Sequence, residues 1–170
     1  MRIKLLVCIL FLVCGCTTTN RNLDVETKFD PNDARFINET GTASISGQAF
    51  LNRQDGQVVY AAGNQINLIP ATPYSRDHLE KVYEGKKFLN TYRAMANNAT
   101  KNADPRYKEL IRQTKADNEG RFTFDKLAPG TYFVQAAVAW QVGDVIRGGT
   151  FYETVTVTDG EQKELIMNGK

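Results

Sequence analysis

The side chains that could carry chemistry are few, and the three cysteines lie together at the start of the chain. Cys8, Cys14 and Cys16 fall within the first sixteen of 170 residues, and no cysteine follows them. The rest of the chain therefore has no thiolate to act as a nucleophile or a metal ligand. Downstream chemistry would have to come from carboxylates, hydroxyl groups and one histidine.

The single histidine, His78, does not complete a typical metal-binding or catalytic set. Asp77 or Glu80 could join it as ligands, but a zinc site usually takes further histidine or cysteine ligands, which favours a lone surface histidine. Residues 117–120 (Asp-Asn-Glu-Gly) lack the spaced oxygen ligands of a calcium loop and are more typical of a turn. Neither a nucleophile elbow nor a phosphate-binding glycine loop is present. The sequence thus predicts no cofactor, no metal and no catalytic residue.

The first fifteen residues have the composition of a secretory signal peptide. A basic start precedes an apolar run of about ten residues, which is too short to cross a ~30 Å hydrocarbon core as a helix. Val13-Cys14-Gly15-Cys16 resembles the bacterial lipobox, in which a small residue precedes a cysteine that is lipidated and becomes the mature N-terminus. The resemblance implies cleavage between Gly15 and Cys16, with a diacylglycerol and an N-acyl chain on Cys16. A plain signal peptide with incidental cysteines is the alternative.

A polar stretch follows the predicted anchor. Residues 17–40 contain few apolar positions and would span roughly 25–30 Å as a flexible coil, so 16–40 is predicted to be a lipidated tether. Thr17 stands where, by resemblance to enterobacterial lipoproteins, an aspartate would keep the protein at the inner membrane. The implied location is the periplasmic face of the outer membrane of a Gram-negative bacterium, with the lipid anchor binding the membrane.

The net charge points away from nucleic acid as a partner. Arg2 and Lys4, in the predicted signal, account for the formal charge of +2, so the remainder of the chain is balanced. A protein that binds nucleic acid would favour a basic excess.

From residue 41 onward, short β segments alternate with turns. The expected strands cover 43–50, 58–60, 65–69, 121–124, 131–141, 149–158 and 163–167, and the stretch 107–115 is expected to become a strand by Leu110. Glycine-containing turns separate several of them, such as Asp55-Gly56, Pro129-Gly130 and 147–149 (Arg-Gly-Gly). The pattern predicts one mostly β domain over 41–170, built as an antiparallel sandwich.

Residues 71–113 interrupt the strands and predict a helical insertion centred on 75–105. Ser75 is the expected N-cap, with Asp77 in the first turn, where it complements the helix dipole. Gly85 separates two apolar faces with helical spacing and is expected to mark a kink or a break. The first face consists of Leu79, Val82 and Tyr83, and the second of Phe88, Leu89, Tyr92, Met95 and Ala96.

The stretch 114–132 carries a family resemblance. Phe122 and Phe124 share one face of a strand, and Pro129-Gly130 leads into the next strand at Tyr132. This hairpin resembles the signature of the carboxypeptidase regulatory-like domain, a seven-stranded transthyretin-like (prealbumin-like) Greek-key sandwich that serves as an accessory module. Residues 45–50 and 61–68 look like the opening strands of that family. The resemblance implies this fold for 41–170 and brings no catalytic residues with it, because those belong to a different domain.

Three hypotheses for the function follow. The leading one is a lipid-anchored, non-enzymatic binding or adaptor module of the cell envelope, with a protein or a glycan as partner and the insertion as the contact surface. The candidate surface residues are His78, Lys81, Tyr83, Lys86, Lys87, Tyr92 and Arg93. A solvated basic face is the alternative reading of the cations among them.

The second hypothesis is an enzyme that modifies envelope polymers, with Asp77, Glu80 or Glu84 in a cleft under the insertion. The third, by analogy of fold, is a structural subunit of a secretion apparatus.

Overall fold

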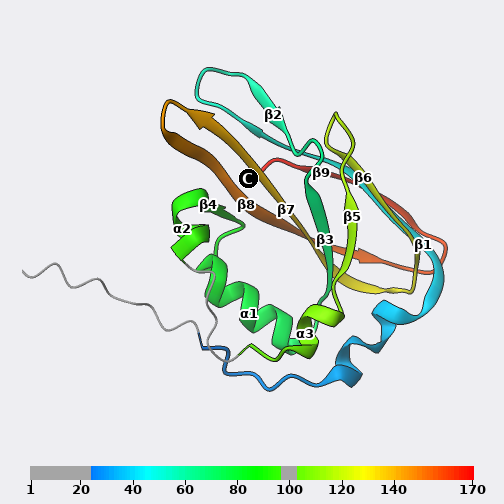
Figure 1. The fold of residues 1–170 in the computed structure, drawn as a ribbon. Helices are drawn as coiled ribbons and strands as arrows, with labels where there is room; N and C mark the ends of the chain where they lie inside the picture. Colours follow the sequence, from blue (N-terminus) through cyan, green and yellow to red (C-terminus); the bar gives the residue numbers. More distant parts are fainter. Residues whose placement is uncertain (1–23, 97–102) are drawn as a thin grey trace, which may run out of the picture.

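The computed structural model describes residues 24–96 and 103–170, which form a two-sheet sandwich with helices on one side (Figure 1). In chain order the elements are η1 (Pro31–Asn38), β1 (Thr40–Asn52), β2 (Val58–Tyr60), β3 (Gln65–Pro70), α1 (Pro73–Tyr83), β4 (Phe88–Asn90), α2 (Thr91–Ala96), α3 (Arg106–Glu109), β5 (Arg112–Lys115), β6 (Arg121–Leu127), β7 (Gly130–Val142), β8 (Val145–Val157) and β9 (Gln162–Met167). The prediction of a mostly β sandwich with a helical insertion is confirmed.

Strand number and direction differ from the expectation. The described residues form nine strands, in a sheet where β2, β6 and β9 flank β1 and in a five-stranded sheet of order β4-β8-β7-β3-β5. Two short edge strands lie beyond the seven main ones. β5 falls in the stretch 107–115, which the sequence predicts to become a strand, whereas β4, with three residues, is too short for alternation to reveal it. The β1–β9 pair is parallel, so the expectation of a wholly antiparallel sandwich is wrong for this pair.

The main core lies between the two sheets. Alternate residues of β1 are buried from Ala43 to Leu51, as expected for a strand with one face turned inward. They meet the inward side chains of the five-stranded sheet, among them Ile66, Tyr132 and Phe151, each at most 1% exposed. Burial of this apolar surface is the main source of the stability of the fold.

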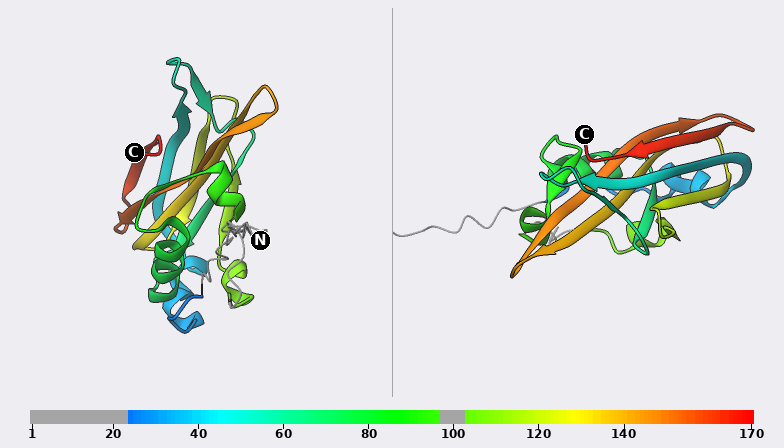
Figure 2. Two further views of the ribbon diagram at one scale, coloured as in Figure 1. Left: turned by 90° about the vertical axis from the view of Figure 1, so that its left-hand side faces the viewer. Right: turned by 90° about the horizontal axis from the view of Figure 1, so that it is seen from above.

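A second apolar layer covers the outer face of the five-stranded sheet. Phe133 lies on that face because it alternates with the inward-facing Tyr132. It packs with α1 residues, including Leu79 and Tyr83, and with Val25 from the N-terminal segment. Figure 2 shows the helices gathered on this side of the sandwich.

The N-cap of helix α1 lies three residues before the expected one. Thr72 is the N-cap: its Oγ1 accepts a hydrogen bond from the Ser75 amide at 3.1 Å, and the Ser75 hydroxyl oxygen accepts one from the Thr72 amide at 2.8 Å. This reciprocal capping box, with Pro73 in the first turn, makes Ser75 its third residue rather than its cap. Asp77 therefore lies beyond the first turn.

Gly85 marks the end of α1 and not a kink within a longer helix. Glu84 caps α1 in the left-handed conformation with φ 55°, and Gly85 continues with φ +72°. The chain then pairs with β8 as β4 before α2 begins. The expectation of helix from residue 88 is thus wrong for 88–90, because pairing with the sheet overrides the helical spacing of the apolar residues.

The N-terminal segment packs against the domain from residue 24 onward. Val25, Ala34 and Ile37 are at most 5% exposed, and 31–38 forms the 3-10 helix η1. The expectation of a flexible tether reaching residue 40 is therefore wrong for 24–39, because its few apolar side chains fill gaps at the edges of both core layers. The rest of the tether and the predicted signal lie outside the described residues.

Candidate functional site

Two hairpins extend past the core at the same end of the sandwich (Figure 1). The β1–β2 hairpin pairs Asn52 with Val58 at its tip. The β7–β8 hairpin ends in a two-residue turn at Gly143 and Asp144, where Gly143 has φ +58°. A positive φ at the first central position favours glycine in such turns, which fixes the register of the strands on either side.

A groove of about 660 Å³ lies between the two hairpins. It is lined by Leu51, Asn52, Arg53, Gln54, Asp55, Phe88, Trp140, Val142, Arg147 and Gly148, and is called the hairpin groove below. Leu51, Phe88 and Trp140 belong to or pack against the main core, so the apolar part of the lining is anchored in the sandwich. The volume falls in the range of small-molecule binding sites.

Trp140 and Arg147 face each other across the β7–β8 hairpin. They are direct Cα partners in the antiparallel register, so their side chains lie on the same face of the sheet, with Cβ atoms typically about 5 Å apart. Trp140 is half-buried and Arg147 is exposed. The pair places an aromatic face and a guanidinium side by side at the groove.

The tip of the β1–β2 hairpin supplies a folded polar wall. Arg53 forms an ion pair with Asp55 at 2.9 Å and donates a hydrogen bond to Gln57 Oε1 at 3.0 Å. The Gln57 amide donates to Asp55 Oδ1 at 3.1 Å, which ties the turn to the same carboxylate. Asn52 and Gln54, both exposed, add amide groups that can donate and accept hydrogen bonds.

Two glycines shape the groove from β8. Gly148 has φ +107°, and a Cβ there would lie 2.1 Å from the carbonyl oxygen of Val138. A Cβ on Gly149 would lie 2.2 Å from the carbonyl oxygen of Leu89 and 2.8 Å from the Phe88 ring. Neither position can carry a side chain without moving a neighbouring strand, so the wall beside Arg147 is bare backbone.

Sequence reasoning missed this site because it placed a turn at 147–149. These residues lie inside β8, which begins at Val145, and the true turn is at Gly143 and Asp144. The signal was present: Trp140 and Arg147 are equidistant from the Gly-Asp pair, as cross-strand partners in a two-residue hairpin must be. The glycines indicated close backbone approach rather than a turn.

Not all residues of the contact surface predicted on the insertion lie at the surface of the protein. Tyr83 is fully buried, packs edge-on against Tyr152 at 4.8 Å and accepts a hydrogen bond from Gln135 Nε2 at 3.0 Å. Burial raises the pKa of its hydroxyl. The expectation that Tyr83 lies on a contact surface is therefore wrong, because it is the side chain that seats α1 on the sheet. Tyr92 lies in α2, and its side chain is outside the described part of the structure.

The basic residues of that surface are mostly paired within the domain. Lys81 binds Glu26 at 2.8 Å, Lys87 binds Glu153 at 2.5 Å, and Arg93 binds Glu84 at 2.5 Å. Lys86 is exposed. These pairs link different segments, and their partial exposure keeps each contribution to stability small.

His78 lies half-buried in an aromatic cluster. Its ring stacks against Tyr74 at 6.3 Å and lies 5.1 Å from the Tyr107 ring. Burial lowers its pKa, and its Nδ1 has no hydrogen-bond partner among the residues that the structure describes. His78 is therefore not the exposed surface histidine that the sequence favoured. Within residues 24–96 and 103–170, no three His, Cys, Asp or Glu side chains are grouped as metal ligands.

Two of the three carboxylates considered for catalysis, Asp77 and Glu84, make contacts within the domain. The amides of Glu26 and Thr27 both donate to Asp77 Oδ2 at 2.8 Å, and the hydrogen bond from Thr27 is the main cause of its lowered pKa. Glu84 is paired with Arg93, as above. Asp77, Glu80 and Glu84 are absent from the lining of the hairpin groove.

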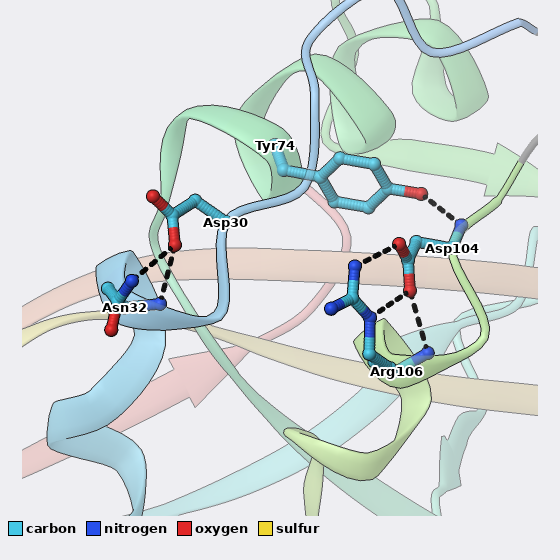
Figure 3. Close-up of polar contacts among 5 residues, drawn as sticks. All are labelled: Asp30, Asn32, Tyr74, Asp104 and Arg106. Carbon is cyan, nitrogen blue, oxygen red and sulfur yellow. Dashed lines mark hydrogen bonds and ion pairs between the residues drawn. The ribbon is translucent and has the colours of Figure 1, made fainter.

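Further contacts join α1 and α3 on this side of the domain (Figure 3). The Tyr74 hydroxyl accepts a hydrogen bond from the Asp104 amide at 3.0 Å, and Asp104 pairs with Arg106 at 2.8 Å. Asp30 caps η1 by accepting from the Asn32 amide at 2.9 Å. The Tyr74–Asp104 hydrogen bond thus links α1 to the segment that leads into α3, whereas the hydrogen bond accepted by Asp30 and the Asp104–Arg106 ion pair are local to their own segments.

Comparison with known proteins places the fold among solved structures. No family model and no curated protein matches the chain. A solved structure that does match is PA1324 from Pseudomonas aeruginosa, provisionally described as a carbohydrate-binding protein. The two share 23% sequence identity with a TM-score of 0.70, over 84% of this chain and 98% of that one. The chain is therefore similar to PA1324 in fold, across nearly the whole length of that protein.

Proposed function

We propose that the protein is a non-enzymatic carbohydrate-binding module and that its ligand lies in the hairpin groove. The observation that carries this proposal is the pairing of Trp140 with Arg147 in a groove that also presents the amides of Asn52 and Gln54. A pyranose ring has an apolar C–H face that packs on an aromatic ring, and its hydroxyl groups hydrogen-bond to amide and charged side chains. The groove offers both kinds of contact within one small volume.

Two likenesses support a binding role. PA1324, which has the same fold, is provisionally described as a carbohydrate-binding protein. Residues 114–132 resemble the carboxypeptidase regulatory-like domain, and we propose that 41–170 is a domain of this accessory type. Because fold does not imply function, the proposal depends on the groove and its side chains.

The proposal is tested by the fluorescence of Trp140, the single tryptophan of the chain. Titration with a panel of envelope and plant-derived oligosaccharides is expected to change its intensity or emission maximum for at least one of them, with saturation. Because no other tryptophan contributes, such a change reports on the groove itself. An oligosaccharide that binds by calorimetry without changing the fluorescence of Trp140 would contradict the proposed site. If no member of the panel bound, the proposed function would be contradicted.

The matched variants are Trp140→Leu and Tyr60→Ala. The leucine keeps an apolar side chain against the core but removes the flat ring, so binding measured by calorimetry is expected to weaken about tenfold or more. Tyr60 is 40% exposed on the neighbouring β2 and lies outside the groove lining, so its loss is expected to leave the affinity unchanged. Circular dichroism checks that both variants are folded.

We further propose that Cys16 is lipidated and anchors the domain to the periplasmic face of the outer membrane. The support is the lipobox resemblance, because Cys16 itself lies outside the described residues. Among the described residues, no helix is long and apolar enough to span a membrane. Metabolic labelling with palmitate is expected to mark the wild type and not Cys16→Ala, with Cys14→Ala as the matched control that still takes up label. Equal labelling of Cys16→Ala and the wild type would contradict the anchor.

A further inference from the structure

We infer that the ligand of the hairpin groove is an acidic glycan, in which a sugar carboxylate binds Arg147 while the ring that bears it packs on Trp140. This inference rests on the proposed function and narrows it to one class of carbohydrate.

The first argument is the charge balance of the groove. Three charged side chains line it: Arg53, Asp55 and Arg147. Arg53 and Asp55 neutralise each other at 2.9 Å, and Gln57 takes a further hydrogen bond from the Arg53 guanidinium. Arg147 makes no side-chain hydrogen bond or ion pair with any residue that the structure describes. The groove therefore has one uncompensated positive charge, at a guanidinium whose planar donors match a carboxylate.

The second argument is that the indole is not covered by a cation. The guanidinium groups that lie over rings in the described residues are those of Arg76, over Phe133, and Arg106, over Phe29. Arg147 thus lies beside Trp140 as its cross-strand partner without stacking on it. The aromatic face and the guanidinium are both available to the same ligand.

The third argument is the geometry of a hexuronic acid. Its carboxylate is attached to a ring carbon and projects from the edge of the sugar ring. When the apolar face of the ring lies on an indole, the carboxylate falls next to the indole, where the cross-strand partner is placed. The bare backbone at Gly148 leaves space beside that partner, and Val142, two residues after Trp140 on the same face of β7, adds an apolar side chain to the lining. A neutral sugar could still accept hydrogen bonds from Arg147 at its hydroxyl oxygens, but it would leave the charge of the guanidinium uncompensated.

The test compares each acid with its own neutral form. The probes are the tetrasaccharides of galacturonate, glucuronate and mannuronate. Each is titrated into the protein by calorimetry at neutral pH, once with its carboxylates ionised and once as the neutral methyl ester. At least one acid is expected to bind about tenfold or more tightly than its ester, with the preference shrinking as salt is raised. Arg147→Gln is expected to bring acid and ester to the same affinity, and Arg147→Lys to restore part of the preference.

The matched control is Arg35→Gln, which removes an exposed arginine from η1, outside the groove, and is expected to leave the preference intact. Equal affinity for acid and ester in the wild type, with binding that still depends on Trp140, would overturn the inference and leave the proposed function standing. An acid preference that survives Arg147→Gln would overturn the assignment to Arg147. Failure of all three acids to bind at millimolar concentration would overturn the inference, and neutral tetrasaccharides titrated alongside would then decide the proposed function separately.

Discussion

Replacement of Tyr132 by alanine is expected to lower the free energy of unfolding by about 3–5 kcal/mol. Tyr132 is fully buried in the main core, and Phe36 of η1 packs edge-on against its ring at 5.2 Å. The alanine variant leaves a cavity between the sheets and removes the surface on which η1 rests. Urea unfolding followed by Trp140 fluorescence measures the loss, and the slope of the transition shows whether unfolding stays cooperative.

The matched variant is Tyr132→Phe, which keeps the ring and removes the hydroxyl group. That hydroxyl donates a hydrogen bond to the carbonyl oxygen of Ala128 at 2.7 Å, a contact like the tyrosine corner of other β-sandwiches. Burial raises the pKa of Tyr132 to about 12, so the group remains a donor at neutral pH. Tyr132→Phe is expected to lower the free energy of unfolding by about 1–2 kcal/mol, because the buried carbonyl oxygen of Ala128 loses its hydrogen-bond donor. Equal losses in the two variants would show that the ring contributes little to the core.

Features set by neighbouring residues were predictable from the sequence. The turn before β6 is an example: Asp117 Oδ1 accepts hydrogen bonds from the amides of Glu119 and Arg121 at 2.8 Å, and Gly120 has φ +74°. Asp, Asn and Gly favour such a turn by their own chemistry, whatever the rest of the chain does. The same locality explains why seven strands and the place of the insertion followed from turn residues and alternation.

Features set by distant segments were not predictable in the same way. Helical spacing identifies Tyr83 as part of an apolar face but does not say whether that face meets solvent or the sheet. The structure turns it inward against Tyr152, far along the chain. The N-terminal segment was misjudged for the same reason, because Val25 and Ile37 look isolated until two separate core layers receive them.

The hairpin groove combines both kinds of feature. Its lining comes from 51–55, Phe88 and 140–148, three stretches that meet only when the sheets are assembled. The β7–β8 register could have been derived from the Gly-Asp turn, and the β1–β2 hairpin follows from the Asp55-Gly56 turn, but nothing in the sequence places one hairpin opposite the other. The sequence therefore supports a prediction of the Trp140–Arg147 pair, whereas the groove around it requires the fold.

The substitution Gly148→Val is expected to remove ligand binding and to destabilise the domain by about 3 kcal/mol or more. Gly148 combines φ +107° with a Cβ position 2.1 Å from the Val138 carbonyl oxygen, so the substitution adds backbone strain to a clash with the adjacent strand. Urea unfolding gives the stability, and calorimetry with the best oligosaccharide of the panel gives the affinity.

Gly143→Val separates the two causes. Gly143 also has a positive φ, +58°, but nothing lies within 4 Å of its Cβ position, so only strain is added, at about 1–2 kcal/mol. If Gly148→Val lowered the free energy of unfolding no more than Gly143→Val does, close packing of β7 and β8 would not be the reason for glycine at position 148. Should Gly148→Val prevent folding altogether, Gly148→Ala offers the same clash with a smaller side chain. To relieve that clash, β8 must move away from β7, which moves Arg147 away from Trp140. The affinity is therefore expected to fall further in Gly148→Ala than in the control variant Gly143→Val.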